Sequence, residues 1–156
     1  MKKIQYDDHT QKKNTLDDDE LYEQRNHQQY LNWIVDGVDF SFNRYICRHL
    51  KTKYGSYKSQ DKKKSRYDEE KYITYAQMIQ KLQNCELICY YCNIEMTLVY
   101  RNKNEKHQWS LERFDNNLGH YDSNTCIACL RCNLQRRNDN HEYFKQSKQW
   151  SLVKLS

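Results

Sequence analysis

The sequence contains no proline and only three glycines among its 156 residues. Because these two residues most often interrupt helices, their scarcity favours a helix-rich chain and excludes a collagen-like or low-complexity one. No apolar run approaches the roughly 18 residues needed to cross a membrane. The N-terminus, MKKIQYDDHTQKK, is charged but lacks the apolar segment of a secretory signal. We therefore expect an intracellular protein that is neither secreted nor bound to a membrane.

Aromatic residues are abundant, with 14 tyrosines, three tryptophans and four phenylalanines. They supply apolar surface for a core, which argues against disorder throughout the chain. A length of 156 residues suits one domain of ordinary size with a short appendage.

The net charge of +5 conceals a segregation along the chain. Residues 44–66 hold nine lysines and arginines against one acid, Asp61, and residues 131–156 hold six against two acids. These basic blocks flank a mildly acidic middle segment. The pattern fits a polyanion that is held at its edges while an acidic centre acts on it.

Three parts are expected along the chain. Residues 1–14 have no periodicity and are expected to form a disordered tail. Residues 15–70 are expected to form a helical basic arm with two helices, the second of which ends at Gly55. Its last part, residues 56–70, is charged and non-periodic and is expected to be a mobile loop.

Residues 71–156 are expected to form the second, strand-containing domain. It begins with a helix capped by Thr74. The segment 109–115 is expected to be a strand, and a second short strand is expected to run directly into a helix after residue 125. A last helix is expected to pack Phe144 and Trp150 onto the core.

The seven cysteines are an odd number in a chain without an export signal, so a disulfide scaffold is not expected. Four of them form two CxxC pairs, a spacing that is typical of a closed structural zinc site. The alternatives are buried free thiols or a redox dithiol, although no βαβ pattern surrounds either pair. Cys126 is a possible substitute ligand, while Cys47 and Cys85 are expected to fill the core. The predicted zinc ligands are Cys89, Cys92, Cys129 and Cys132.

The second CxxC pair ends a longer motif, WSLERFDNNLGHYDSNTCIACLRCNLQRRN. Its elements are LERFDN at 111–116, GH at 119–120, Asp122 with Asn124, and CxxCN ending at Asn133. Over roughly Cys89 to Arg137 the chain resembles the HNH endonuclease family, in a zinc-stabilised branch found in phages and large DNA viruses. The resemblance implies a treble-clef-like ββα-metal domain, so we expect an α+β fold in which the helical arm precedes this domain. It also implies a viral or phage protein located in the host cytoplasm or nucleus.

The resemblance further implies a metal-dependent DNA endonuclease. Glu112 aligns with the family's metal-binding acid, Asn124 with its loop asparagine and Asn133 with its last metal ligand. A catalytic Mg²⁺ or Mn²⁺ is therefore expected at these three residues, with no small-molecule cofactor. Arg113 stands where the commoner family form has the catalytic histidine, and arginine stays protonated and cannot act as a base.

His120 is therefore the candidate general base, with Arg113 as a phosphate clamp. Alternatively, Asp115 orients the attacking water. Each residue also has an interpretation without catalysis. His120 can be an exposed loop residue, Glu112 a surface strand residue and Asp115 a turn former. Asn124 can cap the loop backbone, which is compatible with binding a metal.

Six basic residues are predicted to contact the DNA backbone, three on a helix face in the arm and three in the helix after the second CxxC pair. The function predicted from these features is DNA cleavage. One alternative is a zinc-stabilised DNA-binding or architectural protein that has lost catalysis, for which Arg113 is the main argument. Another is a protein-interaction module built on zinc knuckles, which has no need of the basic block at 44–66. The predicted DNA contacts are Arg44, Arg48, Lys51, Arg131, Arg136 and Arg137.

Overall fold

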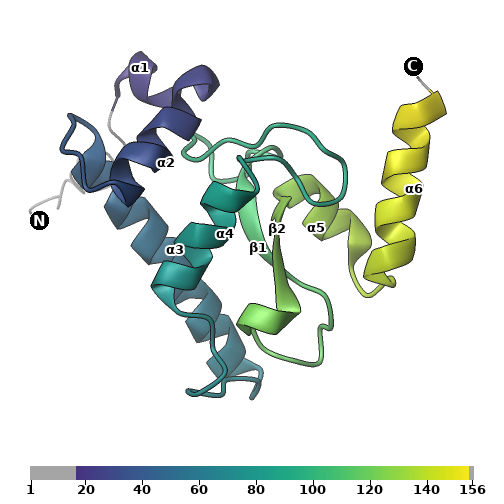
Figure 1. Ribbon diagram of the computed structural model, residues 1–156. Coiled ribbons are helices and arrows are strands. Elements are labelled where there is room, and N and C mark those ends of the chain that lie inside the picture. Colours follow the sequence, from purple (N-terminus) through teal and green to yellow (C-terminus); the bar gives the residue numbers. More distant parts are fainter. Residues whose placement is uncertain (1–16, 155–156) are drawn as a thin grey trace, which may run out of the picture.

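Helices dominate the structure, and two short strands lie between them (Figure 1). The computed structural model describes residues 17–154, so the tail predicted at 1–14 lies outside the described residues. The two strands form one antiparallel sheet, which confirms the predicted α+β class. In chain order the elements, with η marking 3₁₀ turns, are α1 (Asp19–Tyr22), η3 (Gln24–Asn26), α2 (His27–Val35), α3 (Asn43–Lys63), α4 (Tyr75–Asn84), β1 (Trp109–Arg113), η4 (Asp122–Asn124), β2 (Thr125–Cys129), α5 (Leu130–Arg136) and α6 (His141–Lys154).

The first predicted helix is divided into two. The Asp18 carboxylate caps α1 by accepting a hydrogen bond from the Glu20 backbone N–H at 3.0 Å. Glu23 then adopts an extended conformation, with φ −70° and ψ 111°, and the chain passes through η3 before α2 begins. An extended residue cannot continue a helical hydrogen-bond ladder, so the arm bends at this point.

Helix α3 continues through Gly55 to Lys63, so two predictions are wrong: the helix does not end at Gly55, and residues 56–63 are not a loop. A glycine inside a helix costs about 1 kcal/mol relative to alanine. Continuing the helix, however, buries Tyr57 and Asp61 against distant segments of the chain. These tertiary contacts outweigh the local preference of the glycine.

Helix α3 lies along the open edge of β1 and hydrogen-bonds to its backbone. The Lys53 amine donates to the Trp109 carbonyl, and the Tyr57 hydroxyl accepts from the Leu111 backbone N–H at 3.0 Å. An unpaired strand edge otherwise invites pairing with another chain. Helix α5 contacts both strands and α4 contacts β2, so the small sheet lies among helices (Figure 1).

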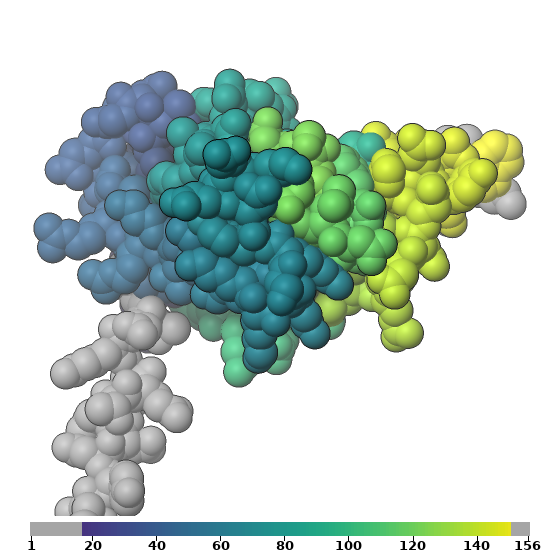
Figure 2. All heavy atoms as spheres, turned by 90° about the horizontal axis from the view of Figure 1, so that it is seen from below, coloured from purple at the N-terminus to yellow at the C-terminus, as the bar shows by residue number. Residues whose placement is uncertain are grey.

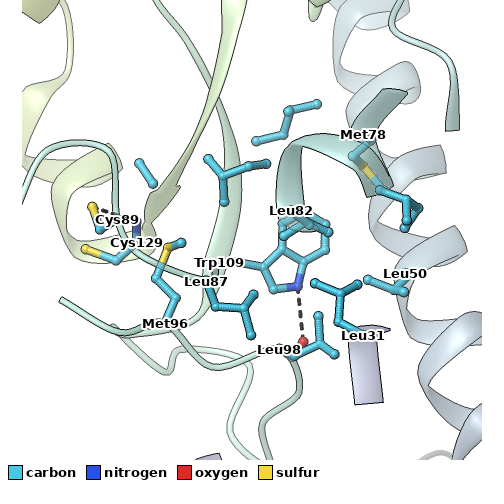
Figure 3. Close-up of a cluster of buried hydrophobic side chains, with 14 of the residues drawn as sticks. Leu31, Leu50, Met78, Leu82, Leu87, Cys89, Met96, Leu98, Trp109 and Cys129 are labelled. Atoms are coloured by element: carbon cyan, nitrogen blue, oxygen red, sulfur yellow. Dashed lines mark hydrogen bonds between the residues drawn. The ribbon is translucent and has the colours of Figure 1, made fainter. Parts of the chain in front are cut away.

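Trp109 lies centrally in the hydrophobic core (Figure 3). Its indole N–H donates to the Leu98 carbonyl at 3.1 Å. One buried cluster joins side chains from the predicted arm with side chains from the strand-containing part. The two parts therefore share a single core. The cluster includes Leu31, Leu50, Met78, Leu82, Leu87 and Met96.

Helix α6 projects at one end of the molecule (Figure 2). Phe144 packs edge-on against Tyr91, with ring centroids 5.0 Å apart, which agrees with its predicted packing. Trp150 is 66% exposed, so the prediction that it packs on the core is wrong. The reason is that α6 extends away from the core beyond Phe144. Among residues 17–154, no helix combines the length and apolar composition required to cross a membrane.

Candidate functional site

Four buried cysteines meet where the loop after α4 approaches the start of α5. The sulfurs of Cys89, Cys92, Cys129 and Cys132 all lie within 4.8 Å of one another. The Cys92 and Cys129 sulfurs are 3.8 Å apart. A tetrahedral site with metal–sulfur bonds of about 2.3 Å requires sulfurs roughly 3.8 Å apart. The cluster can therefore hold a metal ion such as zinc.

The surroundings of this cluster suit thiolate ligands. The Cys129 backbone N–H donates to the Cys89 sulfur at 3.2 Å, and the Cys132 N–H donates to the Cys129 sulfur at 3.4 Å. The Arg131 guanidinium approaches the Cys92 sulfur at 4.0 Å. Contacts with the sulfurs of Cys129 and Cys89 raise the pKa of the Cys132 thiol. A bound cation would favour the thiolate form of these cysteines, because its positive charge neutralises the crowded sulfurs.

The other three cysteines lie outside the cluster. Cys126, the predicted substitute ligand, is buried on β2 opposite Glu112 of β1. Cys47 and Cys85 are half-buried on or next to helices. Four sulfurs already complete a tetrahedral site, so no further ligand is needed.

A pocket of about 370 Å³ lies between α3, β1 and α5. Its lining brings together four of the predicted site residues, which come from the strand, the following loop and the last helix of the motif. These four are Glu112, Arg113, His120 and Asn133. Residues separated by 21 positions in the sequence therefore share one cavity.

His120 is only 3% exposed and is held against helix α3. Its Nδ1 atom lies 2.8 Å from Oδ1 of Asp61, and its backbone N–H donates to Oδ2 of the same carboxylate at 2.7 Å. The imidazole ring packs against Tyr57, with centroids 4.9 Å apart. Burial lowers the pKa of His120 below 6.5, and Asp61 opposes this shift. Because the side chain is buried, the interpretation of His120 as an exposed loop residue is wrong.

Glu112 is buried and paired with Arg136 of α5. The Arg136 guanidinium donates to Oε1 at 3.0 Å, while Oε2 has no hydrogen-bond partner among the described residues. Burial raises the pKa of the Glu112 carboxyl, and contacts with Arg136 and Tyr91 lower it. The interpretation as a surface strand residue is therefore wrong.

Asn133 and Arg113 both line the pocket, and each has polar atoms that form no hydrogen bond within the described residues. The Asn133 amide donates to the Ser110 hydroxyl at 3.2 Å, which leaves its carbonyl oxygen without a partner in the described part of the chain. One end of the Arg113 guanidinium donates to the Asn116 and Leu118 carbonyls, at 3.3 and 3.1 Å. Arg113 thus braces the turn after β1 while it lines the pocket.

Asn124 and Asp115 stabilise the loop and do not line the pocket. The Oδ1 atom of Asn124 accepts from the Asp115 backbone N–H at 3.0 Å, and its side-chain NH₂ donates to the backbone carbonyls of Asp115 and Gly119. The Asp115 carboxylate accepts from the Asn117 N–H at 2.9 Å. These contacts match the alternative interpretations, in which Asn124 caps the loop backbone and Asp115 forms a turn.

The arginines of α5 differ in their exposure. Arg136 is 1% exposed and satisfies the buried Glu112 carboxylate, so the prediction that it contacts DNA is wrong. Arg131 is half-buried beside the cysteine cluster. Arg137 is exposed and lines a second, more open cleft with Lys106.

The predicted DNA contacts on α3 face away from the pocket. Arg44, Arg48 and Lys51 are exposed and share one side of the helix, and we call them the α3 basic stripe. At about 100° per residue, this side lies roughly 120–180° around the helix from Gln60. Gln60 lines the pocket. The pocket and the α3 basic stripe thus lie on different sides of α3.

Among the residues that were not predicted as site residues from the sequence, Lys53 and Tyr57 line the pocket, and Asp61 lies next to the pocket residue His120. Lys53 donates to the Gln108 side chain at 3.1 Å and its amine lies 4.2 Å from the Trp109 ring centroid. Tyr57 and Asp61 contact His120. The sequence signal for Asp61 is that it is the single acid among nine basic residues at 44–66.

Comparisons with models of known protein families, with curated proteins and with solved structures found no match to this chain.

Proposed function

We propose that the chain is a metal-dependent endonuclease of the HNH type that hydrolyses phosphodiester bonds in DNA. The observation that supports this function is the convergence of His120, Glu112, Arg113 and Asn133 in one pocket. The motif that resembles the family supplies all four residues. The neighbouring cysteine cluster matches the zinc-stabilised branch, and we assign a structural Zn²⁺ to it.

The chemistry begins with a water molecule that loses a proton to Nε2 of His120. Neutral imidazole accepts that proton, and the hydroxide attacks the phosphorus atom as the bond to the leaving oxygen breaks. Arg113 neutralises charge that develops on the phosphate oxygens. This role requires no titration of the guanidinium.

The pocket also has the ligands for a divalent cation. Glu112 contributes a buried carboxylate oxygen without a hydrogen-bond partner, and Asn133 contributes an amide oxygen. Mg²⁺ is often held by one or two carboxylates and takes its other ligands from water and phosphate. Such an ion would supply charge neutralisation at the phosphate and at the leaving oxygen.

The test is cleavage of supercoiled plasmid in the presence of Mg²⁺ or Mn²⁺. The wild-type protein should nick or linearise the plasmid, and EDTA should abolish the reaction. His120→Ala should lower the rate by about 10² to 10⁴, because the variant has no general base. His107→Ala is the matched control, since His107 is exposed and outside the pocket lining. Equal rates for wild type and His120→Ala would refute the assignment.

The Glu112–Arg136 pair favours one second candidate function, a DNA-binding protein without cleavage. A carboxylate already neutralised by a buried arginine attracts a cation less strongly than a free one. Arg113→His distinguishes the two functions, because it places the family's commoner base at the end of β1. A wild type that binds but never cuts DNA, together with a variant that cuts, would identify the chain as a DNA-binding relative of a nuclease.

A further inference from the structure

Asp61 is an unusual residue for its position on α3. It is the only acid on a helix that carries seven lysines and arginines, and it is 1% exposed. Buried carboxylates are costly unless their oxygens are satisfied. Both oxygens of Asp61 are used, and both accept from the same residue, His120.

The contact between Asp61 and the loop is closely fitted. A Cβ atom on Gly119 would lie 2.8 Å from Oδ2 of Asp61 and 2.5 Å from the Arg66 carbonyl oxygen, so only glycine fits there. On the other side, the Ile73 N–H donates to the His120 carbonyl at 2.9 Å. This fit gives a physical reason for the glycine in the GH element of the motif. His120 is thereby held from α3 and from the segment before α4.

The second nitrogen of the imidazole is left for the pocket. Because the Asp61 carboxylate only accepts, a neutral His120 ring must carry its proton on Nδ1. Nε2 then has a free lone pair and forms no hydrogen bond within the described residues, and His120 lines the pocket. A general base needs this arrangement.

We propose that Asp61 is a positioning residue that fixes His120 as the Nδ1–H tautomer and presents Nε2 to the pocket. Helix α3, outside the segment that resembles the nuclease family, is then part of the catalytic apparatus. The role in cleavage rests on the proposed function of His120 as the base. The tautomer itself does not depend on cleavage.

The charged and titratable groups that face the ring are Asp61 and Tyr57 from α3 and Arg113 from β1. Among these, Asp61 raises the pKa of His120 and Arg113 lowers it. Loss of the carboxylate should therefore shift the acid limb of the pH–rate profile to lower pH. A purely structural Asp61 would affect the melting temperature without moving this limb.

The experiment combines NMR with kinetics. Long-range ¹⁵N–¹H spectra of the wild type should show the Nδ1–H tautomer for His120, whose signals are assigned by their loss in His120→Ala. In Asp61→Asn the side-chain NH₂ can donate to Nδ1, so the Nε2–H tautomer should appear. The cleavage rate at saturating DNA should fall at least about 100-fold, with little change in KM. Asp61→Glu should recover part of the rate, since it keeps a carboxylate.

The outcomes separate the two proposals. Glu69→Gln, an exposed acid with the same chemical change, should behave as the wild type in every measurement. If the wild type cuts no DNA but shows the Nδ1–H tautomer, the proposed function fails and the positioning by Asp61 stands. An Nε2–H tautomer in the wild type overturns the inference, even if Asp61→Asn does not fold. A folded Asp61→Asn protein with unchanged tautomer, rate and pH profile also overturns it.

Discussion

Glu112 of β1 and Arg136 of α5 form an ion pair of 3.0 Å, with 3% and 1% of their side-chain surfaces exposed. The Arg136 guanidinium also donates to the Arg113 and Asp139 carbonyls. One buried cation therefore joins β1 to α5 and to the turn after it. The pair fixes the pocket residue Glu112 to α5, so the loss of Arg136 should lower the stability of the fold.

Arg136→Met should destabilise the protein by about 3–5 kcal/mol, because it leaves the Glu112 carboxylate buried without its partner. Thermal and urea denaturation measure this change. Arg137→Met is the matched control, since Arg137 is exposed and should change stability by no more than about 0.5 kcal/mol. Equal effects of the two substitutions would show that the pair contributes nothing specific.

Purified protein should contain one Zn²⁺ per chain, bound by the four buried cysteines. Metal binding in such sites contributes directly to folding free energy, so chelation should lower the melting temperature sharply. Cys129→Ser should have the same effect, whereas Cys85→Ser, outside the cluster, should retain the metal. Metal analysis of the purified protein provides the measurement, and a folded sample with no bound metal would contradict the prediction.

Stability should decrease as the pH falls below about 6.5, partly through His27. This residue is fully buried, its Nε2 bonds to the Leu21 carbonyl and its Nδ1 accepts from the Leu98 N–H, both at 3.0 Å. Burial lowers the pKa of His27, so the unfolded chain binds more protons in acid. The contribution of His27 to stability is therefore fully present above pH 6.5. Below that pH the free energy of unfolding declines by up to about 1.4 kcal/mol per pH unit for each such histidine.

Two other histidines contribute in the same direction. Burial, followed by the charge of Lys53, lowers the pKa of His49 to about 4, and burial also lowers the pKa of His120. His27→Gln should therefore flatten the dependence of unfolding free energy on pH without abolishing it. The exposed residue His107, changed to Gln, serves as the control. An unchanged slope in His27→Gln would exclude His27 as a contributor.

Replacing the three residues of the α3 basic stripe by Gln should leave the cleavage rate at saturating DNA unchanged, because the stripe faces away from the pocket. The stripe can still attract DNA at long range, so association at low salt should slow. The slope of log affinity against log salt should change little. A decrease of about 2.7 in its magnitude would mean that all three residues contact phosphate.

Changing Lys106 and Arg137 to Gln should behave differently. Both line the exposed cleft beside α5. For every phosphate that the variant no longer neutralises, the magnitude of the salt slope should fall by about 0.9. Fluorescence anisotropy with a labelled duplex at several salt concentrations measures both variants against the wild type. A slope unaffected by this double substitution would remove the cleft from the DNA interface.

Local features were predictable from the sequence because their geometry is set within a few residues. A CxxC turn brings two sulfurs together whatever surrounds it, and the two pairs do form one cluster. The capping box of Thr74 and Gln77 is likewise a contact across three residues, and it is present at the start of α4. The strand at 109–113 and the helix after the second strand also follow from local patterns.

Tertiary structure decided the features that depend on residues far apart in the sequence. Asp61 and His120 are 59 positions apart, and they meet only because α3 passes through Gly55 and lies along the edge of β1. Arg136 has the sequence context of a DNA-binding residue, but packing buries it because Glu112 needs a cation in the low-dielectric interior. Sequence spacing thus determined which four cysteines form the cluster. Long-range packing determined which charged residues are buried and which remain exposed to solvent.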